Sequence, residues 1–153
     1  MQRREMFALA GFAMAAKSAT VLAQDSNDEL HASLFHVFAT ASGESRVARV
    51  QISNDAGEVP VTGMTARAYA RTVSSQAEWH TAPRSQFAIN MTGSLEVEVS
   101  DGSRQIIGAG DLVFLSDVTG KGHVTRVLTP VTNIFLHVPP GWDMMSWARG
   151  LNP

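Results

Sequence analysis

The sequence predicts an all-β fold, an antiparallel sandwich or barrel, and three observations lead to it. Short segments of alternating apolar and polar residues recur roughly every ten residues from Arg46 onward. Gly, Asp, Asn or Pro bounds each segment, as is typical of turns. No amphipathic segment longer than about two helical turns precedes the C-terminal tail. At 153 residues, 44% of them hydrophobic, the chain has the length of one domain.

The charge of the chain argues against two classes of partner. The formal net charge is −2, the pI is about 6.2, and neither Lys nor Arg forms a run. We therefore expect no nucleic acid and, once the N-terminal segment is cleaved, no membrane as partners. The chain has no Cys, so disulfides and thiol chemistry are excluded.

Residues 1–23 have the composition of a signal peptide. Arg3 and Arg4 precede an apolar, Ala-rich stretch, and the segment ends in the small residues before Gln24. Paired arginines followed by Met6 and Phe7 resemble a twin-arginine export signal, while an ordinary secretory signal or a retained helix remains an alternative. We expect a periplasmic or secreted protein. Residues 24–45 are interpreted as a linker and N-terminal segment, in which Ala32 to Ala39 could be a strand or a short helix.

Residues 46–140 are expected to form the barrel. Arg46 to Ile52 alternates like a strand and is followed by a turn at 54–57. Residues 65–73 alternate as well, with Arg67 and Tyr69 on one face and alanines on the other. The alanine face would suit close packing of a second layer or a roomy cavity.

The strand expected over residues 86–91 points to a homodimer. Gln86 and Asn90 share one face with Ala88, and the opposite face, with Phe87 and Met91, is wholly apolar. That apolar face must be covered by the N-terminal strands or by a second copy of the chain. In residues 95–99 the branched apolar residues are expected to point inward, before a hairpin turn at 101–102.

A buried strand is expected to follow the turn at Gly108, and the loop Val118 to His123 contains two glycines that let His123 return toward the barrel. Residues 131–138 close the barrel, with His137 assigned a structural role. The C-terminal tail, residues 141–153, places Trp142 and Met145 on one helical side, which favours packing on the chain itself or on a dimer mate.

The stretch from Trp79 to His123 resembles the cupin superfamily, especially single-domain bacterial cupins that read H-x-A-P-R-x-Q and T-G-K-G-H. In the general motif G-x5-H-x-H-x3-4-E-x6-G, His80 takes the place of the first His, and Gln86 that of the Glu. Ala82 stands where that motif has its second His, and Gly93 matches its last Gly. In the second motif, G-x5-P-x-G-x2-H-x3-N, the matches are Gly110 and His123, in a loop two residues longer than the pattern; Ser116 replaces Pro and Val127 replaces Asn.

The resemblance implies a double-stranded β-helix, or jelly-roll barrel, with a metal site in which two of the four usual ligand positions are altered or lost. His80, His123 and Gln86 could hold one divalent ion (Fe, Mn, Ni or Zn) with positions open for water and substrate. Alternatively the two histidines hydrogen-bond in a polar pocket that holds no metal.

Four further residues are candidates for the chemistry. Arg84 and Lys121 could orient a carboxylate or enolate, although either could be a solvated surface charge. Asp117, like Glu78, is a candidate general base, although a turn-forming role suits it as well. Asn90 and Trp79 are expected to line the pocket.

Three functional hypotheses remain open at this level. The first is an exported, dimeric, metal-dependent enzyme that oxidises, isomerises or eliminates from a small organic acid or an enolisable carbonyl compound. The second is a binding or sensing protein without turnover, favoured by the replaced ligands. The third is a structural dimer with a vestigial pocket. No nucleophile elbow, P-loop, dinucleotide fingerprint or H-E-x-x-H motif occurs.

Overall fold

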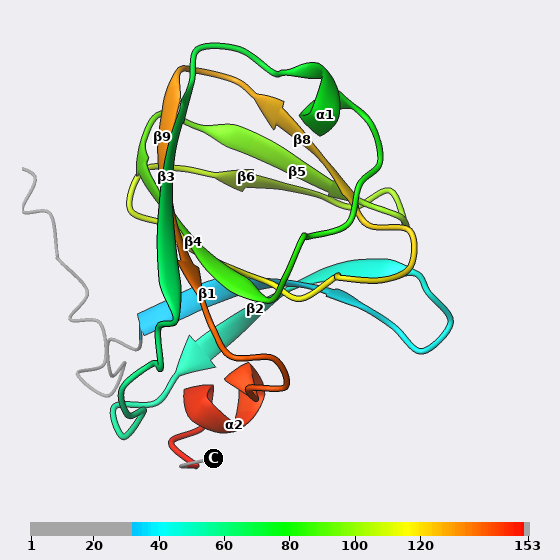
Figure 1. The fold of residues 1–153 in the computed structure, drawn as a ribbon. Coiled ribbons are helices and arrows are strands. Elements are labelled where there is room, and N and C mark those ends of the chain that lie inside the picture. Colours follow the sequence, from blue (N-terminus) through cyan, green and yellow to red (C-terminus); the bar gives the residue numbers. More distant parts are fainter. Residues whose placement is uncertain (1–31, 152–153) are drawn as a thin grey trace, which may run out of the picture. The chain divides into compact units, whose positions relative to one another are not determined.

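Two β-sheets face one another in the computed structural model, which describes residues 32–151 (Figure 1). Within that range the strands are β1 (Ala32–Ala39), β2 (Ser45–Ile52), β3 (Gly63–Tyr69), β4 (Gln86–Thr92), β5 (Leu95–Val99), β6 (Arg104–Ile107), β7 (Leu112–Leu115), β8 (His123–Val127) and β9 (Val131–His137). The helices are α1 (Ser74–Ala77) and α2 (Met144–Ala148). The expected signal segment, residues 1–23, and residues 24–31 lie outside the described part.

The larger sheet has the order β2-β1-β7-β4-β9-β3, and the smaller one the order β6-β5-β8. Neighbouring strands are antiparallel except for β1 and β7, which run parallel. The predicted fold class is confirmed for the described residues, which form a mostly β structure of two sheets. In residues 32–151 no helix is long and apolar enough to cross a membrane.

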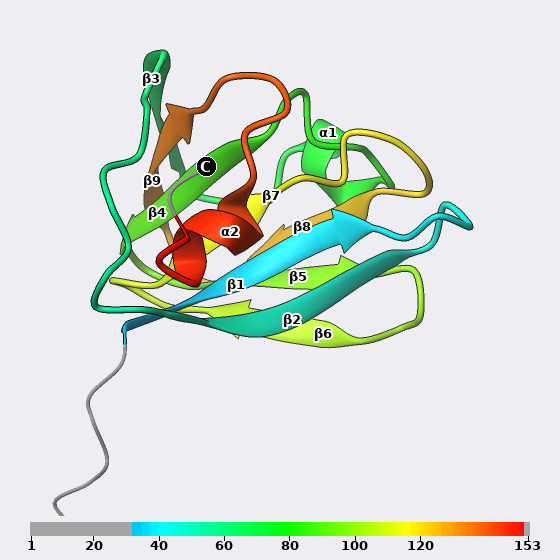
Figure 2. The ribbon, with the colours of Figure 1, turned by 90° about the horizontal axis from the view of Figure 1, so that it is seen from below.

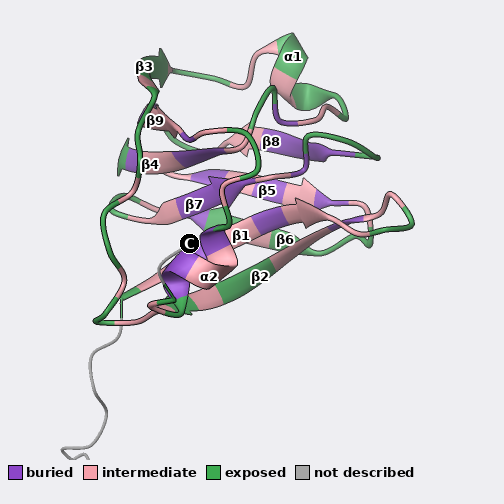
Figure 3. Cartoon of the chain, turned by 60° about the horizontal axis from the view of Figure 1, so that its bottom comes forward, coloured by how far each residue is buried: buried purple, intermediate pink, exposed green. Residues whose placement is uncertain are grey.

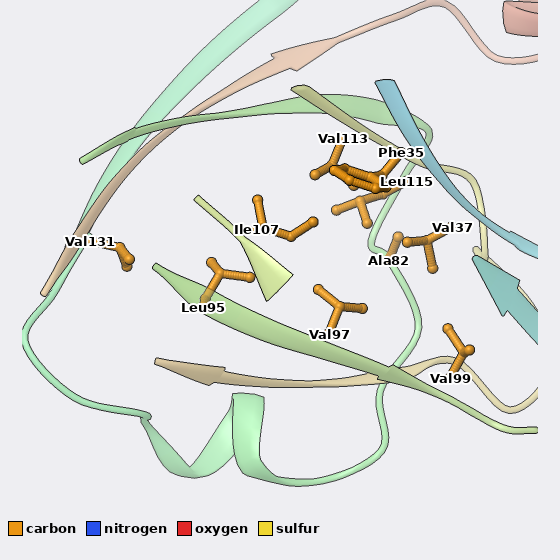
Figure 4. Packing of buried hydrophobic residues seen from close by; sticks show 10 residues of the cluster. All are labelled: Phe35, Val37, Ala82, Leu95, Val97, Val99, Ile107, Val113, Leu115 and Val131. Carbon is orange, nitrogen blue, oxygen red and sulfur yellow. The ribbon is translucent and has the colours of Figure 1, made fainter. Parts of the chain in front are cut away.

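The core between the sheets follows from period-two alternation. Leu95, Val97 and Val99 of β5 are buried, as predicted, and meet Val113 and Leu115 of β7 across the interior (Figure 4). The intervening glutamates lie on the outer face of β5, where Arg104 and Arg126 pair with them. The small sheet therefore presents an apolar wall inward and an ion-pair network outward.

Two expectations on the N-terminal half need correction. Residues 32–39, which the sequence left open between a strand and a short helix, form β1, which pairs with β2 on one side and β7 on the other, so the sheet begins at Ala32 and not at residue 46. In β3 the alanine face is neither packed nor part of a cavity: Ala66 and Ala68 are exposed, while Arg67 and Tyr69 line the cavity. The face of β3 that carries Thr65, Arg67 and Tyr69 is therefore the one turned toward the cavity.

The C-terminal tail covers the outer face of the larger sheet (Figure 2). Asp143 caps α2 by accepting a hydrogen bond from the backbone N–H of Ser146 at 3.0 Å. Met144 and Trp147 of α2 are buried against Phe87 of β4, and the ring centroids of Phe87 and Trp147 are 5.6 Å apart. The apolar face that suggested a dimer is thus covered, at Phe87, by the chain's own tail. Figure 3 shows that α2 contains buried residues and lies over the strands of the larger sheet.

Candidate functional site

A cavity of about 370 Å³ lies between the two sheets. Its apolar wall comes from Ala88, Leu95, Val97, Ile107, Val113, Leu115 and Phe135. Its polar lining includes Arg67, His80, Arg84, Gln86, Asn90, His123, Thr125, Asn133 and His137. An apolar cavity with a few convergent polar groups has the size and character of a small-molecule site.

His80 and His123 lie side by side, as the sequence predicted. Their backbones form an isolated antiparallel bridge with N–H···O distances of 3.0 and 2.8 Å, and their ring centroids are 4.5 Å apart. Gly122 makes the approach possible: its φ is +71°, and a Cβ there would overlap the His80 carbonyl oxygen. The glycine loop therefore brings the second histidine back to the first.

Both imidazoles are oriented through Nδ1. Nδ1 of His123 contacts Oδ2 of the fully buried Asp117 at 2.6 Å, and Nδ1 of His80 contacts the Glu78 carbonyl oxygen at 2.9 Å. Since a carbonyl or carboxylate oxygen only accepts, each Nδ1 carries a proton, which leaves Nε2 as the lone-pair nitrogen. No hydrogen bond within residues 32–151 engages either Nε2. Metal-binding histidines are commonly held in this way.

Gln86 is buried and lines the cavity from β4 of the larger sheet, whereas His123 begins β8 of the smaller sheet. It is the first residue of β4, and its register partner on β9 is His137. Nδ1 of His137 accepts a hydrogen bond from Nη1 of Arg84 at 3.0 Å, and its Nε2–H donates to Oγ1 of Thr65 at 3.3 Å. The structure thus brings Gln86, Arg84 and His137 to the cavity.

Sequence reasoning missed His137, which it assigned to structure. The signal was present in the alternation of β9, because Asn133, Phe135 and His137 share one face, and all three line the cavity. The sequence does not reveal the register between β4 and β9, which pairs His137 with Gln86.

Three expected roles are not supported by the positions of the side chains. Lys121 does not line the cavity; it is exposed and pairs with Glu44. Trp79 exposes 50% of its surface and is also absent from the lining, because the chain turns it away while His80 turns inward. Asp117 has no exposed surface and does not reach the cavity, so it positions His123 instead of acting as a base on substrate. Asn90 does line the cavity and is 2% exposed.

The candidate ligand atoms, two imidazole nitrogens and one amide oxygen, are of types that bind divalent ions, but none of them carries a negative charge. Two imidazoles and one amide oxygen suit borderline first-row metals. Within residues 32–151 no group of three or more His, Cys, Asp or Glu side chains is arranged to hold a metal. Ala82 is 3% exposed and lines the cavity, and it supplies no ligand atom there.

His36 lies outside the cavity. Its Nε2 contacts Oγ of Ser116 at 2.7 Å, and its ring packs against Phe38 and Phe114. Burial lowers the pKa of His36 to about 4, an effect that the negative charge of Asp117 only partly offsets. The ring is therefore neutral at physiological pH.

Comparison with known proteins adds the following. No family model and no curated protein matches the chain. Among solved structures, it is similar to a candidate ethanolamine utilization protein Q from Salmonella typhimurium LT2, with 12% identity over 72% of this chain and 98% of that chain and a TM-score of 0.31. It is also similar to the EutQ protein of Clostridium difficile, with 10% identity over 78% of this chain and 77% of that chain and a TM-score of 0.29. Similarity of this extent places no constraint on function.

Proposed function

We propose that this chain is an exported, metal-dependent cupin-type enzyme that acts on a small organic acid or an enolisable carbonyl compound. The observation that carries the proposal is the adjacent His80–His123 pair, in which both Nδ1 atoms are engaged and both Nε2 atoms are left for a ligand. Such a pair, in the lining of a cavity with largely apolar walls, supports a metal site with room for substrate.

His80 and His123 would hold the ion, with the amide oxygen of Gln86 as a third ligand. A bound divalent ion would supply Lewis acidity toward an oxygen of the substrate. Asp117 contributes through His123: its carboxylate fixes the tautomer and raises the basicity of the imidazole. Because Gln86 is neutral, that carboxylate is the negative charge in contact with the pair.

Arg84 would hold the anionic end of the substrate. Its guanidinium lines the cavity and uses Nη1 on His137, so its other N–H groups remain for a carboxylate or enolate. His137 in turn is tied to Thr65, which limits the positions that the guanidinium can take. The apolar walls exclude water from the rest of the ligand and favour a small carbon skeleton.

A second candidate function is the binding or sensing of a small molecule without turnover. It is favoured by Gln86 at the place of the family's Glu and by Ala82 at the place of its second His. Among the described residues, no Asp or Glu side chain lines the cavity, so no carboxylate is placed there to act as a general base. A ligand that raises the melting temperature of metal-free protein and is recovered unchanged would support this alternative.

The test is metal analysis of protein purified without an affinity tag, compared with a His80→Ala/His123→Ala double variant. His36→Gln is the matched control, because it removes a histidine outside the cavity. We expect close to one equivalent of metal in the wild type and the control, and little in the double variant. Equal and negligible metal in the wild type and the double variant, after incubation with Fe(II), Mn(II), Ni(II) and Zn(II), would end the proposal.

Export and homodimerisation belong to the same proposal. Residues 1–23 support export by their composition. A dimer was expected because one face of β4 is apolar, and the chain's own tail already covers Phe87 on that face. Met64 and Met91 are still 66% and 49% exposed, and they leave apolar surface for a second copy. Native mass spectrometry of protein recovered from the periplasm would report signal cleavage, subunit count and bound metal together.

A further inference from the structure

The cavity wall formed by β4 and β9 has three rows, two polar and one apolar. From one end to the other the register pairs are Gln86–His137, Ala88–Phe135 and Asn90–Asn133. All six residues line the cavity. With a rise of about 3.3 Å per residue, the two polar rows are roughly 13 Å apart. The cavity thus has a histidine end and an asparagine end, separated by apolar surface.

The Asn90 amide is fixed in one orientation. Its Nδ2 donates to the carbonyl oxygens of Gly93 and Ile107 at 2.9 and 3.4 Å. The reverse orientation would bring its oxygen against these two acceptors. The Asn90 oxygen therefore remains a buried acceptor, and within the described residues it has no hydrogen-bond partner.

Asn133, directly opposite, is 5% exposed, and its oxygen is also buried without a partner in the described part of the chain. A half-turn about its Cβ–Cγ bond exchanges nitrogen and oxygen. The nitrogen could then donate toward Asn90, while the oxygen would take the place of the nitrogen. In either orientation Asn133 offers the cavity one polar, uncharged atom that no side chain satisfies. An unsatisfied buried amide costs free energy, which a ligand group can recover.

We infer that the Asn133 end of the cavity binds a neutral polar group of the ligand, such as a hydroxyl or a carboxamide. A hydroxyl both donates and accepts, so it can pair with either orientation of the amide. The substrate class is then a small acid with an apolar middle and a neutral polar group at its far end. The placement of the acidic group near Arg84 rests on the proposed function; the neutral subsite does not.

The neutral character follows from the two amides, which carry no charge. Arg67 of β3 is the register partner of Asn133 and also lines the cavity, with Nη1 on the Tyr69 hydroxyl at 3.3 Å, so the dicarboxylic acids test whether its guanidinium binds a second anion. Burying a second carboxylate against two amides would cost more than burying a hydroxyl. A dicarboxylic acid is therefore the disfavoured ligand.

The inference can be tested by isothermal titration calorimetry of the purified protein with three matched series of about four to ten carbons. The series are alkanoic acids, ω-hydroxy acids and dicarboxylic acids. At one chain length we expect the hydroxy acid to bind roughly fivefold more tightly than the alkanoic acid. Asn133→Leu should abolish this preference and leave the alkanoic acid bound. Thr132→Val, on the opposite face of β9, should preserve it.

Three results would overturn the inference: no hydroxyl preference at any length, a preference retained in Asn133→Leu, or tighter binding of the dicarboxylic acid. If no acid binds, the proposed anion site at Arg84 is wrong. The neutral subsite is then tested with phenol and benzene, whose affinities are compared by NMR titration and whose positions are found by soaking wild-type crystals. Tighter binding of phenol, with its hydroxyl at Asn133, supports the subsite. Equal binding, or a hydroxyl placed elsewhere, refutes it. The soak also serves if Asn133→Leu does not fold.

Discussion

Replacing Asp117 with Asn should weaken metal binding while leaving the fold intact. Asp117 is fully buried, and its Oδ2 lies 2.6 Å from Nδ1 of His123. The carboxylate can only accept, so it keeps the proton on Nδ1 and the lone pair on Nε2. An amide can instead donate to Nδ1, and His123 would then carry its proton on Nε2, where it cannot bind a metal.

The magnitude follows from what the substitution removes. Loss of a carboxylate that supports a metal-binding histidine typically costs 10- to 100-fold in affinity, or about 1.4–2.7 kcal/mol. The free energy of unfolding should change by less than about 1.5 kcal/mol, because Asn keeps the shape and Oδ1 of Asp117 has no hydrogen-bond partner in the described residues to lose. Metal affinity and stability should therefore separate in this variant.

The assay is a competition titration with a chromophoric chelator on tag-free apoprotein, with urea unfolding in parallel. Asp111→Asn is the matched control: its carboxylate accepts a backbone hydrogen bond from Gly108 at 2.7 Å but does not contact the histidines. An unchanged metal affinity in Asp117→Asn, or an equal loss in the control, would refute the reasoning.

Three further predictions concern stability. Burial lowers the pKa of His36 to about 4, below its unfolded value of about 6.5, so the stability it contributes is complete above pH 6.5 and is lost as the pH falls toward 4. Lowering the pH from 7 to 4 should therefore reduce the unfolding free energy of the wild type by about 1–2 kcal/mol more than that of His36→Gln, a figure reduced to allow for the partial exposure of the ring. Urea unfolding of both proteins at the two pH values measures this difference. Gly122→Ala should lower the unfolding free energy by about 3 kcal/mol or more and abolish metal uptake, because the added Cβ overlaps the bridge between the two histidines. Gly110→Ala is the control: its Cβ would meet open space, so the unfolding free energy should fall by only about 1 kcal/mol. Trp147→Ala should lower the unfolding free energy by about 3–4 kcal/mol and expose the outer face of the larger sheet, whereas Leu151→Ala, at a 58% exposed residue, should change it by less than about 0.5 kcal/mol in the same denaturation series.

The parts of the site that local pattern determines could be predicted from the sequence. Alternation placed Gln86 and Asn90 on one face of one strand, and the structure has both on the cavity wall. Two glycines in the loop before His123 indicated a sharp return of the chain, and that return brings the ring of His123 beside that of His80. Each of these inferences needed only residues within one strand or one turn.

The parts that failed depend on contacts between distant residues. Alternation in β3 separates Arg67 and Tyr69 from the alanines, but it does not say which face meets the cavity. Lys121 is close in sequence to His123, yet its position is set by Glu44, 77 residues away. The tail was expected to pack on the chain or on a partner, and only the position of Phe87 decided between them.

The electrostatics of the site follow from Ala82 and Gln86 in the cavity lining together with the buried carboxylate of Asp117. Ala82 gives the cavity space where an imidazole would stand, and Gln86 contributes a dipole in place of a charge. A divalent ion on this wall would therefore keep most of its charge, offset chiefly by Asp117 acting through His123. An ion left with that charge binds more weakly, since fewer protein ligands neutralise it, but it attracts an anionic ligand more strongly. On this proposal, weak metal affinity and a preference for organic acids would have a single physical cause, and a protein that binds metal tightly but ignores anions would contradict both.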